Sequence, residues 1–312
     1  MQQDKSFLSF LTRKGGLAII VITSLIALLI NLGSTHSKET DPLITEIEPV
    51  NVVEQQAWQL AQGVVEADED VQEQFVAELL ELYLKVEDSD VVIFYCEGGW
   101  GSRPLSINPE GASLVLGIES KLTQLGYAYF TADYPRTSMD LREYLFEAKE
   151  FLMRYPEKAK QMAAKIDFLT QQVDGLKAIV VGKSTGAIVT DEIARLLENN
   201  PSVYTIQIGS PLGKQKSLTD RSLTLSGNGL VADAFVGRDI KAMIKANGLK
   251  SFILNCAPSF TPIDWLISRT ILVIGICNTD LAFEVPGHKY MWHYPGVSST
   301  IESFLVEHFD RI

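Results

Sequence analysis

The stretch that decides the fold is AIVVGKSTGAIVTDEIARLL, residues 178–197. It opens with the short apolar run 178–181, which is typical of a buried parallel strand. The segment from residue 187 onward has apolar residues at helical spacing. Between the two lies GKSTG, residues 182–186. The pattern predicts a strand, a tight turn and a helix, with Ser184 at the apex of the turn.

Ser184 is a candidate nucleophile because its turn has the pattern Gly-x-Ser-x-Gly, from Gly182 to Gly186. A serine hydroxyl is a weak nucleophile, so an enzyme must hold its oxygen clear of the backbone, near a base and near oxyanion donors. The glycines remove side chains where strand and helix pack closest, and the helix N-terminus favours developing negative charge. The alternative is an ordinary turn whose glycines serve packing alone.

The same residues also resemble the end of a phosphate-binding loop, G-x-x-x-x-G-K-[ST], in a nucleotide-binding protein. That motif has a glycine before its variable positions, and this chain has Lys177 at that place. The variable positions would also fall on the predicted strand, so we rank nucleotide binding below hydrolysis. Lys183 could lower nearby pKa values or receive an anionic substrate group, but we expect it to point into solvent.

An apolar run at residues 17–32 predicts a membrane-spanning helix at the lower end of the required length. Basic residues precede it and no A-x-A-like cleavage site follows, so we favour a retained signal anchor over a cleaved signal peptide. The positive-inside rule then predicts that residues 1–16 are cytoplasmic and that the rest of the chain lies on the other side. Residues 33–51 are predicted to tether the anchor to a domain at 52–312.

Composition excludes several other classes. A formal charge of -12 with no basic stripe argues against a nucleic-acid partner. The sequence has no H-E-x-x-H motif and no paired-cysteine spacing, so no metal site is predicted. Its 3 cysteines are too few for a disulfide framework in a domain of this size, although Cys256 and Cys277 could form one bridge.

Strand-like and helix-like runs alternate from residue 91 onward. This alternation predicts an α/β fold with a mostly parallel sheet, helices on both faces, and reactive groups at the carboxyl ends of the strands. Residues 213–250 interrupt the alternation and are a candidate cap. The predicted strands are 91–95, 127–131, 178–181, 203–208, 252–254 and 271–276, and the predicted helices are 52–85, 112–125, 141–172, 187–199 and 299–309.

A glycine-rich loop follows the first of these strands, with Gly98, Gly99, Trp100 and Gly101 in succession. Glycines allow a loop to bend inward and present amide groups to a reacting oxygen. We therefore expect an oxyanion hole formed by amides at Trp100 or Gly99 and at Thr185. The alternative is a glycine-rich turn that has no catalytic role.

These motifs together resemble the lipase/esterase-type serine hydrolases of the α/β-hydrolase superfamily, over about residues 91–305. The order of a Gly-Gly-x-Gly loop, a G-x-S-x-G turn, a carboxylate and a late histidine is the order of that family. Two features depart from it: Lys183 stands where the family often has histidine, and the first two strands of the family's sheet are missing. The resemblance implies an α/β-hydrolase-like domain that cleaves ester bonds through an acyl-enzyme and needs no dissociable cofactor.

The base can be sought by elimination among the 4 histidines of the sequence. His36 lies in the predicted tether and His308 in the predicted terminal helix, which leaves His288 and His293. His288 follows a glycine, and family members commonly carry their histidine in such a Gly-His pair. The resemblance therefore favours His288, with His293 as the alternate.

A histidine base needs an acceptor on its other ring nitrogen. Asp280 follows the predicted strand 271–276 and resembles the acid of the family, although it is close to His288 in sequence. Asp264 would be the acid if 271–276 is the last strand, and Glu284 ranks third.

We therefore predict a single-pass serine hydrolase, anchored in a lipid bilayer, whose catalytic domain lies on the non-cytoplasmic side and takes a small-molecule or lipid ester. Ser184 attacks the carbonyl, His288 transfers the proton and Asp280 orients His288. Two alternatives remain open. One is a non-catalytic binding protein with the same fold, and the other is the nucleotide-binding protein considered above.

Overall fold

A computed structural model describes most of the chain from residue 52 onward. The described residues are 52–65, 68–99, 104–134, 146, 150–151, 153–211, 219–246 and 284–310. The predicted anchor and tether at 17–51 lie outside them, as do the predicted strands at 252–254 and 271–276. Within the described residues, no helix combines the length and the apolar character needed to cross a membrane.

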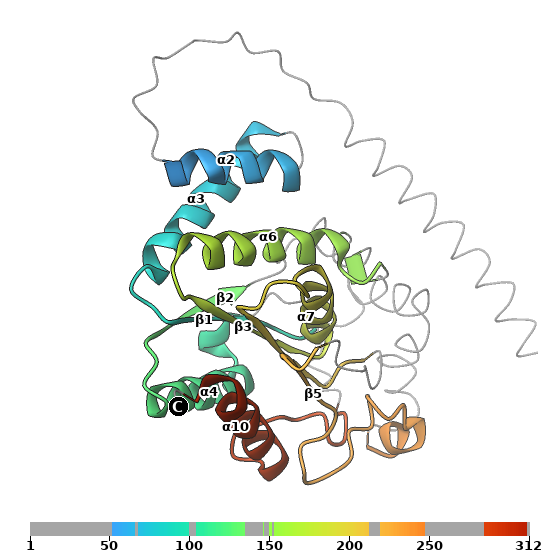
Figure 1. Cartoon of the computed structure of the whole chain (residues 1–312). Helices are drawn as coiled ribbons and strands as arrows, with labels where there is room; N and C mark the ends of the chain where they lie inside the picture. The colour runs from blue at the N-terminus through green and yellow to red at the C-terminus, as the bar shows by residue number, and fades with distance from the viewer. Residues whose placement is uncertain are drawn as a thin grey trace, which may run out of the picture. The chain divides into compact units, whose positions relative to one another are not determined.

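A parallel sheet of 5 strands lies at the centre of the described residues (Figure 1). Its order is β2-β1-β3-β4-β5, and each neighbouring pair is parallel. The inner strands β1, β3 and β4 are buried along almost their whole length, which explains their continuous apolar runs. The strands are β1 (Val91–Cys96), β2 (Tyr129–Tyr134), β3 (Lys177–Lys183), β4 (Val203–Ile208) and β5 (Ser222–Leu225).

Strand β5 was not predicted, because it falls within residues 213–250, which we expected to form a cap. It pairs with β4 in the register Thr205 with Ser222, and the Thr205 hydroxyl donates to Ser222 Oγ at 3.0 Å. Its 4 residues, Ser-Leu-Thr-Leu, alternate polar and apolar as an edge strand does. This part of the stretch therefore belongs to the sheet and not to a cap.

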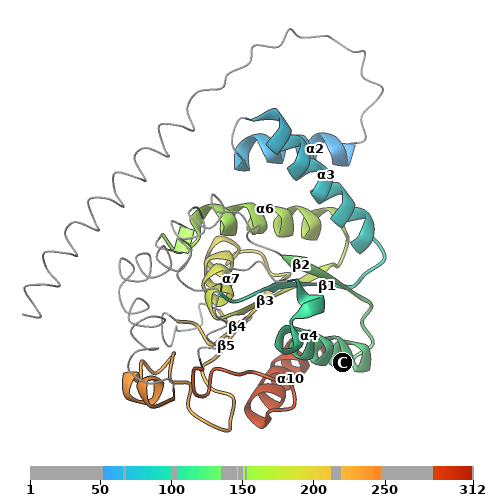
Figure 2. The same ribbon diagram turned by 180° about the vertical axis from the view of Figure 1, so that it is seen from behind.

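Helices cover both faces of the sheet, as Figures 1 and 2 show from opposite sides. One core cluster joins the helices α2, α3, α6 and α7 to one set of sheet side chains, such as Val92 and Phe94. The other joins α4 and α10 to the alternate set, such as Val91 and Ile93. The predicted α/β class is confirmed. The helices are α2 (Val52–Val64), α3 (Glu69–Val86), α4 (Pro109–Gln124), α6 (Pro156–Gln172), α7 (Thr185–Leu196) and α10 (Pro295–Phe309), with a short 3-10 turn, η1 (Leu105–Ile107).

Side-chain caps set the starts of two of these helices. The single helix predicted over 52–85 is in fact two, and α3 begins where Asp68 accepts a hydrogen bond from the Val71 amide at 3.2 Å. Helix α4 begins at Asn108, whose side chain accepts from the Gly111 amide at 3.1 Å. This cap fixes the first turn of α4, which contacts the candidate active site.

Candidate active site

Ser184 lies on a strained turn between the end of β3 and the start of α7. Its φ of 52° and ψ of -118° are rare for a residue with a side chain. The turn is held because the Ser184 amide donates to the Ile208 carbonyl at 2.8 Å and the Ser184 carbonyl accepts from the Ala187 amide at 3.0 Å. The predicted strand, turn and helix are therefore confirmed, with the serine at the apex.

Both glycines of the Gly-x-Ser-x-Gly pattern lie where a side chain has no room. A Cβ on Gly182 would overlap the Gly186 carbonyl and the Thr190 hydroxyl. A Cβ on Gly186 would overlap the carbonyl oxygens of Cys96 and Glu97. Packing thus explains the glycines, and it brings the start of α7 against the loop that follows β1.

The glycine-rich loop after β1 contacts the serine turn directly. A Cβ on Gly98 would lie 3.0 Å from Ser184 Cβ, and the Thr185 hydroxyl donates to the Gly99 carbonyl at 2.6 Å. The structure therefore brings Gly99 and Thr185, two of the predicted oxyanion residues, to the same place. Trp100 lies outside the described residues.

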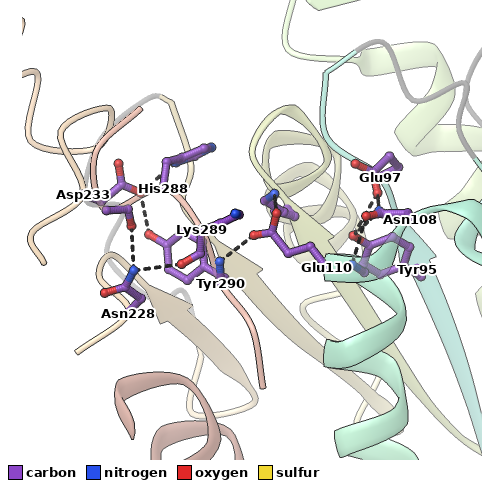
Figure 3. A network of polar contacts seen from close by, with 12 residues as sticks. Tyr95, Glu97, Asn108, Glu110, Asn228, Asp233, His288, Lys289 and Tyr290 are labelled. Atoms are coloured by element: carbon purple, nitrogen blue, oxygen red, sulfur yellow. Dashed lines mark hydrogen bonds and ion pairs between the residues drawn. The ribbon is translucent and has the colours of Figure 1, made fainter. Parts of the chain in front are cut away.

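His288 forms a close polar contact with a carboxylate that the sequence did not reveal. Its Nδ1 lies 2.8 Å from Asp233 Oδ2, and the side chain of Asp233 is fully buried (Figure 3). The Tyr290 hydroxyl donates to the same oxygen at 2.5 Å. The other oxygen, Oδ1, accepts from the amides of Phe235 at 2.8 Å and Val236 at 3.1 Å. Every described partner of this carboxylate is thus a donor to it.

These donors keep Asp233 ionised. Burial by itself would raise the pKa of Asp233, but the hydrogen bond and charge of His288 and the bonds from Tyr290 and Val236 hold the pKa below its ordinary value. Burial, together with the negative charge of Asp233, raises the pKa of Tyr290, so its hydroxyl stays a donor. A carboxylate on Nδ1 leaves Nε2 of His288 to act as a proton acceptor.

The ring of His288 lies on the turn after β4, next to the serine turn. A Cβ on Gly209 would lie 2.9 Å from His288 Cε1. Gly209 follows Ile208, the residue whose carbonyl accepts from the Ser184 amide. The ring of His288 therefore contacts the turn after β4, which is hydrogen-bonded to the serine turn at the carboxyl edge of the sheet.

Asn228 fixes the backbone on both sides of His288. Its side-chain amide donates to the carbonyl oxygens of Gly287 at 3.3 Å and Lys289 at 2.8 Å. Its Oδ1 accepts from the amides of Leu230 at 2.9 Å and Val231 at 3.1 Å. This buried side chain therefore joins the segment after β5, which carries Asp233, to the segment that carries His288.

The two other predicted site residues that the structure describes, His293 and Glu284, are not in contact with Asp233. His293 packs against Tyr294, with ring centroids 4.7 Å apart, beside a surface hollow that Pro109 and Trp292 help to line. Glu284 is exposed. Asp280 and Asp264 lie outside the described residues. Asp233 contacts the ring nitrogen of His288 for which Asp280, Asp264 and Glu284 were the candidates. The sequence signal that could have led to Asp233 is the short alternating run at 222–225, which forms β5.

Lys183 does not point into solvent as expected. Only 13% of its side chain is exposed, and its Nζ lies 2.5 Å from Glu110 Oε2. Glu110 belongs to the first turn of α4, far away in sequence, so nothing in the local pattern around Lys183 predicted this ion pair. The ammonium group of Lys183, which precedes the candidate nucleophile, therefore already has a carboxylate partner within the protein.

A second buried cluster joins the loop after β1 to the start of α4. Glu97 Oε2 accepts from the Tyr95 hydroxyl at 2.9 Å and from the Asn108 side-chain amide (Figure 3). Burial, together with the charge and hydrogen bond of Glu97, raises the pKa of Tyr95 and keeps its hydroxyl protonated. The Asn108 that caps α4 thus also holds Glu97, which directly precedes the glycine-rich loop. Across the described residues, no group of His, Cys, Asp and Glu is arranged to hold a metal ion.

Comparisons with known proteins give little beyond this geometry. No family model matches the chain, and no curated protein matches it in sequence. Among solved structures, the chain is similar to a Trichoderma reesei cutinase in complex with a C11Y4 phosphonate inhibitor. The identity is 15%, the match covers 59% of this chain and 86% of that chain, and the TM-score is 0.32. This is a partial likeness, so membership of the α/β-hydrolase superfamily stays a prediction.

Proposed function

We propose that the protein is a serine hydrolase that cleaves an ester-type bond through an acyl-enzyme. The observation that carries the proposal is the Asp233–His288 pair, whose ring contacts Gly209 on the turn that is hydrogen-bonded to Ser184. A serine on a strained turn, a histidine whose ring contacts the neighbouring turn, and a carboxylate on Nδ1 of that histidine are the kinds of group that nucleophilic catalysis by serine uses.

The roles follow from the chemistry of each group. Ser184 Oγ attacks the ester carbonyl while Nε2 of His288 takes its proton. His288 then gives that proton to the leaving alcohol as the ester bond breaks, and water releases the acyl group by the reverse proton path. Asp233, in the place for which we had considered Asp280, orients the ring and stabilises the imidazolium. Backbone amides at Thr185 and in the Gly99–Trp100 loop are the proposed oxyanion donors.

The proposal also includes the location of the enzyme at a membrane. An anchor at residues 17–32, with the catalytic domain on the non-cytoplasmic side, is supported by the hydropathy and flanking charges of the sequence. A domain tethered to a bilayer would meet lipid or acyl esters, and this is the substrate class that we propose. The test is membrane fractionation of the full chain and of a chain lacking residues 1–33: only the full chain should resist extraction at alkaline pH.

Nucleotide binding is the weaker alternative. In a phosphate-binding loop the lysine must reach the phosphates, whereas the Lys183 ammonium is paired with Glu110. A non-catalytic role would leave Ser184 without unusual reactivity.

Covalent labelling tests the reaction directly. A fluorophosphonate probe should label the full-length protein in detergent, and Ser184→Ala and His288→Ala should abolish labelling. Ser303→Ala is the matched control, because Ser303 is an exposed serine on α10 that bonds only within its own helix. A folded wild-type protein that does not react would overturn the hydrolase and leave a binding role.

A further inference from the structure

One carboxylate joins the serine turn to the histidine segment. Glu110 Oε2 accepts from Lys183 Nζ at 2.5 Å, and Glu110 Oε1 accepts from the Tyr290 backbone amide at 2.5 Å. Lys183 directly precedes Ser184, and Tyr290 follows closely after His288. In Figure 3, Glu110 lies between the His288 segment and the cluster of Tyr95, Glu97 and Asn108. Each of its two oxygens therefore fixes a different part of the candidate active site.

The position of Glu110 in α4 makes this link rigid. It lies in the first turn, after the Asn108 cap, where the helix N-terminus favours a negative charge. Its side chain is 16% exposed, so solvent competes little for its two bonds. A partly buried ion pair of this kind gains little stability, because desolvation offsets its attraction, but it does fix geometry.

Tyr290 transmits this constraint to His288. Its side chain is fully buried, its amide donates to Glu110 and its hydroxyl donates to Asp233. The residue is thus held at both ends, by α4 and by the carboxylate that orients the histidine. Loss of the Glu110 bond would free the backbone directly after His288, while Asn228 would still hold the carbonyl of Lys289.

We propose that Glu110 is a positioning residue that sets the separation of His288 and Ser184, with Lys183 as its counter-charge. This inference rests on the proposed hydrolase function, and it assigns to Lys183 a partner within the protein and not an anionic substrate. Small displacements of reacting groups lower turnover strongly, so the link matters for rate more than for substrate binding.

The test measures kcat and KM for a soluble ester, together with the fluorophosphonate labelling rate, in the full-length protein. Glu110→Leu should lower kcat about tenfold or more while KM changes less than about threefold. Glu110→Gln keeps an acceptor for the Tyr290 amide and should recover part of the loss. The double variant Glu110→Leu/Lys183→Met should be no slower than Glu110→Leu alone, because both changes break one link.

Glu119→Gln is the matched control. Glu119 is also a carboxylate of α4, and it accepts from the Thr131 hydroxyl at 2.5 Å. The substitution Glu119→Gln should leave kcat unchanged. Thermal melting and circular dichroism measure the folded fraction of each variant, and each rate is divided by that fraction.

Three outcomes would overturn the inference: an unchanged kcat in Glu110→Leu, equal losses in Glu110→Leu and Glu119→Gln, or additive losses in the double variant. A failed hydrolase proposal is distinguishable from all three, because the wild-type protein would then show neither labelling nor turnover.

Discussion

The hydroxyl of Tyr290 donates to Asp233 Oδ2 at 2.5 Å, and that oxygen also lies against Nδ1 of His288. Two donors on one buried oxygen hold the carboxylate against the histidine ring. Tyr290→Phe removes one of them without changing the shape of the side chain. We expect the free energy of unfolding to fall by about 1.5–3 kcal/mol, as for a hydrogen bond to a charged group, and kcat to fall as well.

Urea unfolding and steady-state kinetics check this prediction. Tyr129→Phe is the control, because Tyr129 is partly exposed on β2, at the opposite edge of the sheet from β5. Equal effects of the two substitutions would show that the hydroxyl of Tyr290 has no special role.

Asp233→Asn should remove most of the activity while the fold persists. An asparagine can present an N–H to Nδ1 and so favour the wrong tautomer of His288, which in serine hydrolases costs about 10⁴ in kcat. The fluorophosphonate labelling rate measures the loss, and far-ultraviolet circular dichroism confirms folding. Retention of wild-type labelling by Asp233→Asn would mean that another group orients the histidine.

The same substitution should change how stability depends on pH. The folded pKa of Asp233 lies below its ordinary value of 3.8, so between these two values the folded state binds fewer protons than the unfolded state. The stability contributed by Asp233 is therefore complete above about pH 3.8 and is lost as the pH falls through the folded pKa. Asp233→Asn should remove this dependence.

Urea unfolding at a series of pH values between about 2 and 7 measures the difference between wild type and variant. Glu78→Gln provides a comparison, because burial by itself would raise the pKa of Glu78, whereas Lys165, 2.6 Å away, and the hydrogen bond from Gln74 together hold it below its ordinary value. A wild-type advantage that grows as the pH falls would contradict the assignment of Asp233 as an ionised, stabilised carboxylate.

Gly186→Ala tests whether close packing sets the serine turn. The added Cβ would overlap the carbonyl oxygens of Cys96 and Glu97, so the start of α7 must shift. We expect a loss of about 1–3 kcal/mol in stability and a loss of labelling at Ser184. Gly63→Ala in α2 is the control, since a Cβ there meets nothing within 4 Å, and it should stabilise the protein by about 0.5–1 kcal/mol.

Asn228→Ala tests the attachment of the histidine segment. It removes donors to Gly287 and Lys289, so we expect lower stability, by about 1–3 kcal/mol, and a lower kcat for the protein that remains folded. Asn200→Ala removes a comparable set of bonds, to Asp167 and Thr170, on the other face of the sheet. It should lower stability but not kcat, and a matching loss of kcat would show that the effect of Asn228 is global.

The sequence predicted those parts of the fold that depend on local pattern. The strands β1, β3 and β4 are buried, so each reads as a continuous apolar run. Strand β5 is short and lies at the edge of the sheet, and its alternating residues did not stand out from the surrounding loop. The break between α2 and α3 was missed as well, although the acidic residues at 68–70 that cap and open α3 mark it.

In the candidate site, too, the features set by local sequence were predicted and the long-range contacts were not. Ser184 and its turn were found because strand, glycines and helix are contiguous in the chain. Asp233 was missed because the strand that precedes it, β5, was not recognised and because its partner His288 is 55 residues away. The expectation for Lys183 was wrong for a similar reason, since its partner Glu110 is 73 residues distant. Contacts of this kind follow from the topology of the sheet and not from periodicity.

The position of His288 after all the described strands in the sequence has a consequence for biosynthesis. By the time residue 246 has left the ribosome, every described strand, Ser184 and Asp233 have been made, but the proposed base has not. The nascent protein can thus assemble its sheet and serine turn while it is still inert toward esters. Under the proposed function, hydrolysis would begin only when the segment that carries His288 docks against the serine turn.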